Sequence, residues 1–212
     1  MEGQVGELNR PAAAVIPHMQ PATPSSLGPA LIAAAGEARP GAELLPVLGC
    51  LMRVPAPPLE LQQRVETLLV ALMRDALVRG EKSGAIAVQR FIRLGLQANH
   101  IFAPGWRRTM IRTSAKLLGP EALHAVLTEI DSGATLATYA WLPAFFGAHS
   151  NCAAHQILNL IRPAQSTAST ALVAEILNQM GVEGPTLDQL YDRVPPGARE
   201  LIETGAIKVT AA

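Results

Sequence analysis

Apolar residues recur every three or four positions along most of this chain, which is the spacing that places them on one face of an α-helix. The clearest case is the stretch 59–79, where the apolar set is Leu61, Val65, Leu68, Leu69, Leu72, Met73 and Ala76. Strict alternation of apolar and polar residues is hard to find, and the strong helix formers alanine and leucine are abundant. The pattern predicts an all-α protein that is more than half helical, with no sheet beyond a hairpin.

Proline and glycine divide this pattern into about ten helices. We expect Ser150 to cap one of them, Pro143 to bend or shorten another, and Gly181 to end a third in a left-handed conformation. The predicted helices cover residues 25–36, 42–53, 59–79, 84–99, 106–118, 121–131, 135–146, 150–161, 167–180, a short stretch from 185, and 195–203.

The 212 residues are enough for one large domain or two small ones. We predict two helical domains joined by a short linker, because proline and glycine cluster near the middle of the chain. The predicted order is a flexible arm at 1–22, an N-terminal domain at 23–103, a linker or helix at 104–119, a C-terminal domain at 120–205 and a tail at 206–212.

Charge is unevenly distributed, although the formal net charge is zero. The stretch 74–116 holds nine Lys or Arg and two acidic residues, whereas residues 117–212 hold four basic and nine acidic ones. This split favours head-to-tail self-association, or contact of the basic segment with a polyanion or nucleoprotein. Arg107, Arg108 and Arg112 are the candidate contact residues, and ordinary solvated helix faces are the alternative explanation.

Nothing in the sequence favours an enzyme, a cofactor or a metal centre. His149-x-x-Cys152-x-x-His155 is the one cluster with metal-binding residue types, but a closed zinc site needs a fourth ligand. Cys50 and Cys152 make no disulfide framework, so both thiols are expected to be free. Because neither a membrane span nor a signal pattern is evident, we expect a soluble protein in a reducing compartment such as the cytoplasm.

Several short motifs, in order along the chain, resemble the capsid region of retroviral Gag, closest to the lentiviral kind. The best match lies at 90–97 and runs into Phe102-Ala103-Pro104, which resembles the last helix of the family's N-terminal domain and the linker after it. The matching motifs are Thr23-Pro24-x-x-Leu27, Leu45-Pro46 to Leu51 with Ala56-Pro57 and Leu59-Glu60, Arg90-Phe91-Ile92-x-Leu94-Gly95-Leu96-Gln97, Asn151-Cys152, Ile157-Leu158-x-Leu160-Ile161-x-Pro163, and Gly181-Val182-Glu183-Gly184-Pro185.

The resemblance implies a capsid-like structural protein, viral or virus-derived, that forms homo-oligomers and works in a virion or the host cytoplasm. Trp141-Leu142 falls where the family has the tryptophan–methionine pair of its two-fold dimer contact, so these residues are candidate interface anchors. Two alternatives stay open. One is a viral matrix-like protein that bridges membrane and nucleoprotein, and the other is a bacterial helical adaptor or secretion-accessory protein.

Overall fold

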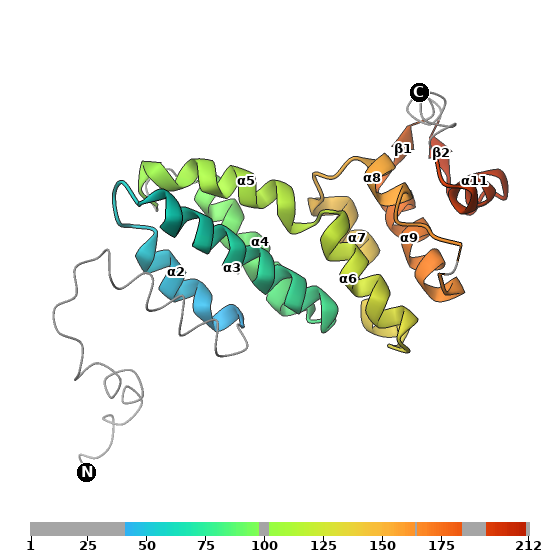
Figure 1. Cartoon of the computed structure of the whole chain (residues 1–212), viewed down its shortest axis with the longest axis horizontal. Coiled ribbons are helices and arrows are strands. Elements are labelled where there is room, and N and C mark those ends of the chain that lie inside the picture. Colours follow the sequence, from blue (N-terminus) through green and yellow to red (C-terminus); the bar gives the residue numbers. More distant parts are fainter. Residues whose placement is uncertain (1–40, 98–101, 164, 184–193, 211–212) are drawn as a thin grey trace, which may run out of the picture.

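The computed structural model describes residues 41–97, 102–163, 165–183 and 194–210, and most of these residues are helical. The predicted arm, the helix at 25–36 and the short helix from 185 lie outside the described residues. The molecule is elongated, with α2 to α5 at one end and α8 to α11 at the other (Figure 1).

The first half is built from α2 (Leu45–Leu51), α3 (Leu59–Val78), α4 (Lys82–Gln97) and α5 (Arg107–Leu117), with short 3₁₀ turns η1 (Ala42–Leu44) and η2 (Pro104–Trp106) before α2 and α5. α3 packs against both α4 and α5, and it has the largest number of buried residues among the described helices. The predicted helices at 59–79 and 106–118 are confirmed within two residues. α4 begins at Lys82 instead of after Gly84, because the turn is completed at Gly80, whose φ of 67° suits glycine.

The second half contains α6 (Pro120–Asp131), η3 (Leu136–Tyr139), α7 (Leu142–His149), α8 (Ala154–Leu158), α9 (Thr167–Met180) and α11 (Pro196–Glu203). The single helix predicted at 135–146 was wrong. Pro143 lies in the first turn of α7, where no backbone donor is needed, so it starts this helix instead of bending a longer one. As predicted, α9 ends at Gly181, which has a φ of 76°.

Two further boundaries differ from the predictions. Ser150 does not start the next helix as predicted: it ends α7, and α8 begins only at Ala154. Its hydroxyl donates to the carbonyl of Leu118 and accepts from the amide of Cys152. The stretch 206–212 is not simply a tail: Ile207 is buried, and β2 (Val209–Thr210) pairs in parallel with β1 (Val182–Glu183). This two-residue pairing is parallel, unlike the hairpin that was allowed for.

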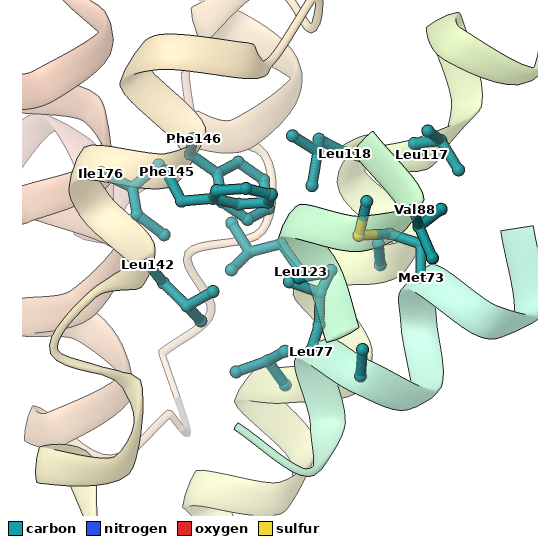
Figure 2. Close-up of a cluster of buried hydrophobic side chains, with 14 of the residues drawn as sticks. Met73, Leu77, Val88, Leu117, Leu118, Leu123, Leu142, Phe145, Phe146 and Ile176 are labelled. Atoms are coloured by element: carbon teal, nitrogen blue, oxygen red, sulfur yellow. The ribbon is translucent and has the colours of Figure 1, made fainter. Parts of the chain in front are cut away.

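The buried side chains of the described residues form one connected cluster that runs through both halves. Figure 2 shows its middle, where Met73 and Leu77 of α3 lie near Leu123 of α6, and Leu142 and Phe146 of α7 complete the contact. The segment 104–119, predicted as a linker or helix, is η2 and α5, and its Trp106 is 0% exposed. The apolar face of α5 therefore belongs to this core, while the division of the chain into two domains stays a prediction.

Candidate interaction surfaces

Trp141 and Leu142, predicted together as interface anchors, have different surroundings. Leu142 is the first residue of α7 and is 0% exposed, with its side chain in the core beside Leu77 and Leu123 (Figure 2). It has no surface to offer to a partner, so its assignment as an anchor is corrected: it is a core residue. Trp141 is only partly buried, so it can contact both this core and another molecule.

The indole of Trp141 is fixed by local contacts. Its Nε1 donates a hydrogen bond to the carbonyl of Thr138 at 3.1 Å. Its ring meets Phe145 edge-on with 5.2 Å between centroids, and Phe145 meets His149 in the same way at 5.0 Å. Such edge-to-face pairs are favourable arrangements for aromatic rings. The partly exposed tryptophan is thus held in one orientation before any partner binds.

The stretch of sequence around Trp141 carries no formal charge. Charges of another segment border it, because Thr138 lies against Gly80, between Arg79 and Glu81. From Ser132 to Ile161, thirty consecutive residues include no Asp, Glu, Lys or Arg, although at the overall charged fraction of 16% about five would be expected. Many of these residues are exposed and small, among them Ala137, Ala140, Ala144, Ala148 and Ala153. We call the exposed residues of 132–161 the uncharged surface. This surface is not among the predicted sites, although the gap in charged residues was a signal in the sequence that could have revealed it.

α7, which carries part of the uncharged surface, packs closely against α9. α7 and α9 make the most extensive helix–helix contact among the described elements. At Gly147 a side-chain Cβ would lie 2.8 Å from the carbonyl oxygen of Gln179, which is closer than such atoms approach. Only glycine allows the two backbones to come this near, so Gly147 sets the position of α7.

The carboxylate of Asp131 lies at the beginning of the same region. Asp131, the last charged residue before the uncharged run, accepts hydrogen bonds from the hydroxyls of Ser166 and Ser169, each at 2.6 Å, and from the amide of Ser166. The two serine hydroxyls stabilise the ionised carboxylate and lower the pKa of Asp131. Ser166 also caps α9 by accepting from the amide of Ser169. The end of α6 and the start of α9 are thereby tied together.

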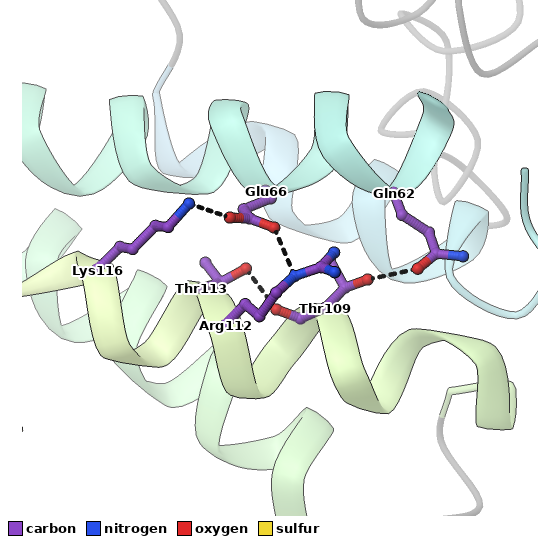
Figure 3. A network of polar contacts seen from close by, with 6 residues as sticks. All are labelled: Gln62, Glu66, Thr109, Arg112, Thr113 and Lys116. Carbon is purple, nitrogen blue, oxygen red and sulfur yellow. Dashed lines mark hydrogen bonds and ion pairs between the residues drawn. The ribbon is translucent and has the colours of Figure 1, made fainter. Parts of the chain in front are cut away.

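A different polar arrangement joins α3 to α5 (Figure 3). Glu66 is 8% exposed, and its carboxylate binds the Nε of Arg112 at 3.1 Å and the Nζ of Lys116 at 2.6 Å. Beside it, the hydroxyl of Thr109 donates to the Oε1 of Gln62 at 2.9 Å. Arg112, predicted as a contact residue for a partner, is therefore already engaged within the chain.

The other two predicted contact residues differ from Arg112. Arg107 and Arg108 begin α5, both are exposed, and neither has an acidic side chain within 4 Å among the described residues. The same is true of Arg90 and Arg93 on α4. The structure thus separates arginines that neutralise internal acids from arginines that face solvent without an acidic partner. Sequence position alone could not make this distinction.

The cysteines and histidines within the described residues do not assemble into a site. Cys50 and Cys152 are unbonded thiols, and burial raises the pKa of the Cys152 thiol, which donates to the Oε1 of Gln156 at 3.0 Å. Within the part of the chain that the structure describes, no three His, Cys, Asp or Glu side chains gather closely enough to hold a metal ion. A search of the same residues for a helix with the length and apolar character of a membrane span finds none.

Comparison of the chain with protein-family models, with curated proteins and with solved structures gives no match.

Proposed function

We propose that this protein is a structural subunit that assembles with copies of itself into a shell of the capsid type. The observation that carries this proposal is the uncharged surface with the partly exposed, locally fixed Trp141 near its centre. Exposed surface without charge is unfavourable for a lone soluble protein, most of all when the net charge of the whole chain is zero. Burying it against a second subunit removes this disadvantage.

A two-fold contact between identical surfaces is the simplest use of such a region. Closed two-fold dimers are the commonest homo-oligomers, and tryptophan is enriched among the residues that contribute most to binding. Small residues at Ala144 and Ala148, three and seven positions after Trp141, allow a second helix to approach closely. The resemblance to the capsid region of retroviral Gag implies a two-fold contact at Trp141. On this proposal the subunit works in a virion or, if domesticated, in a reducing cytoplasm.

The test measures the mass of the protein by light scattering after gel filtration, over a wide range of concentrations. Trp141→Ala should weaken association about thirtyfold or more, since losing a central tryptophan anchor typically removes about 2 kcal/mol or more of binding free energy. Ala144→Glu should have an effect of the same kind, because it buries a charge in the contact. Leu142 is left unchanged, because shortening a core leucine would unfold the scaffold that presents the contact.

Gln63→Glu is the charge control, because it places the same charge at an exposed position of α3, in the first half of the molecule and outside the uncharged surface. It should leave the association state unchanged. Circular dichroism of each variant should match the parent protein. A wild-type protein that stays monomeric at high concentration would exclude the proposal. So would variants at positions 141 and 144 that associate as the parent does.

A further inference from the structure

One long stretch of the chain carries positive charge only. From Lys82 to Pro120, thirty-nine residues include seven Lys or Arg and no Asp or Glu. This stretch contains the whole of α4 and α5, which pack against each other and against α3. Whatever neutralises these charges must come from another element or from another molecule.

The structure shows which of the seven charges are neutralised internally. Glu66 of α3 takes up Arg112 and Lys116 (Figure 3). The other five, Lys82, Arg90, Arg93, Arg107 and Arg108, are exposed and have no acidic partner within 4 Å among the described residues. We call the four arginines of this group the arginine face. By contrast, two other arginines are paired with acids close to them in the sequence. Arg64 of α3 is paired with Glu60, and Arg79, the residue after α3, is paired with Asp75 and Glu81.

The four arginines lie on the exposed sides of two helices that pack against each other. The start of α5 lies near the end of α4, because Arg107 lines the same surface hollow as Gly95. Arg93, two residues before Gly95, points to a different side of α4. The Met110 side chain also approaches Gly95, which confirms that the start of α5 lies against the end of α4. Positive charge from both helices is therefore exposed on two neighbouring elements of the first half.

The arginine face is not explained by the stability of the helices. Arg107 and Arg108 occupy the first turn of α5, which has no acidic residue and no side-chain cap. The first turn is the positive end of the helix dipole, where cations are unfavourable and anions are favourable. An anionic partner at this place would compensate both the helix end and the guanidinium groups.

We propose that the arginine face binds the phosphate backbone of single-stranded nucleic acid, without preference for sequence. The guanidinium group matches phosphate with two parallel hydrogen bonds, and all four cations are arginines. The face includes no acidic side chain to repel phosphate, and the acidic residues of α6 begin only at Glu121. This inference does not depend on self-assembly, since a monomer carries the complete face.

The test is the salt dependence of binding to a fluorescently labelled, mixed-sequence single-stranded DNA of twenty nucleotides, followed by anisotropy. Four phosphate contacts predict a slope of about −3 in a plot of log affinity against log salt concentration, or about a fiftyfold loss between 50 and 200 mM salt. A second oligonucleotide of unrelated sequence should bind with the same affinity, because phosphate contacts carry no sequence information.

Two pairs of substitutions with equal change in net charge separate a defined face from a general charge effect. Arg107→Gln with Arg108→Gln should make the slope less steep by about 1.4, because two phosphate contacts are lost. Arg64→Gln with Arg79→Gln should leave the slope unchanged, since these two arginines form ion pairs with acidic residues of the chain itself. Arg90→Gln with Arg93→Gln repeats the first result on α4, at positions where no ion pair is broken.

Circular dichroism confirms that each double variant is folded. The absence of oligonucleotide binding at 50 mM salt would overturn the inference, and so would equal slopes for the variants of the arginine face and the Arg64/Arg79 control. Neither result would bear on the proposed assembly, which is measured by mass without nucleic acid.

Discussion

Two neighbouring regions of this chain use charge in opposite ways. The stretch 82–120 has seven positive charges and no negative one, whereas the stretch 132–161 has no charge of either sign. Between them lies α6 with Glu121, Glu129 and Asp131 and no Lys or Arg. All three stretches contain amphipathic helices, and each helix contributes its apolar face to the same core. The difference lies entirely on the outer faces.

Because of this difference, a contact through one region should depend on salt concentration, and a contact through the other should not. A contact through the arginine face weakens as salt screens it, because its attraction is electrostatic. A contact through the uncharged surface depends on removing apolar area from water and is insensitive to moderate salt. One protein could therefore keep its subunits associated while releasing a polyanion.

The largest effect is expected at Gly147, where α7 meets α9. Gly147→Ala places a Cβ 2.8 Å from the carbonyl oxygen of Gln179, so α7 must shift. We expect a loss of about 1–3 kcal/mol in the free energy of unfolding, as for other overpacked sites. Urea denaturation measures it. Self-association should weaken as well, because the shift moves the helix that carries the uncharged surface.

Gly49→Ala is the matched control in the first half of the molecule. A Cβ at Gly49 would lie 3.6 Å from the Phe91 ring, an ordinary contact, and Gly49 is inside α2. Alanine should therefore raise the free energy of unfolding by about 0.5–1 kcal/mol through its better helix propensity. If both substitutions changed stability in the same direction, the tight α7–α9 contact would not be the controlling feature.

Much of this fold follows from sequence periodicity. The apolar spacing in 59–79 and 167–180 is long and regular, so α3 and α9 were predicted almost residue by residue. The predictions failed where short elements depend on distant contacts. η3 and α7 replace one expected helix because Tyr139 donates a hydrogen bond to the carbonyl of Val78, sixty-one residues earlier, and fixes the turn there. Such a contact has no local signature.

The candidate surfaces were predicted only in part. Arg107, Arg108 and Arg112 look alike in the sequence, and only the position of Glu66 on a neighbouring helix shows that Arg112 is already paired. Trp141 and Leu142 are likewise adjacent in the sequence, yet the side chain of Leu142 is buried in the core and that of Trp141 is only partly buried. Pairings between helices decide these roles, and the periodicity of a single helix contains no information about them.

A medium effect is expected at Glu66, the acid that neutralises two cations of α5. Glu66→Gln should lower the free energy of unfolding by about 0.5–1.5 kcal/mol, a small value because Arg112 and Lys116 are largely exposed and screened by water. The same change frees two cations for phosphate, so the salt slope for oligonucleotide binding should become steeper than in the parent. Glu60→Gln, which leaves only Arg64 unpaired, should not change the slope. An unchanged slope for Glu66→Gln would show that free positive charge on α5 does not govern binding.

The smallest effect is expected at Asp131, which ties together the two ends of the uncharged stretch. Hydrogen bonds from Ser166 and Ser169 lower the pKa of Asp131 in the folded protein below its ordinary value of about 3.9. The ionised carboxylate therefore stabilises the fold above about pH 4, and this contribution is lost as the pH falls through the lowered pKa. Asp131→Asn removes the titrating group, so the difference in unfolding free energy between the two proteins should shrink steadily as the pH is lowered from 5 to 2. Denaturation at a series of pH values measures this difference, and Glu129→Gln serves as a control that removes a carboxylate from the same helix without touching these serines. A difference that stays constant over this range would show that the serine hydroxyls do not favour the ionised form, and that another contact holds α6 to the start of α9.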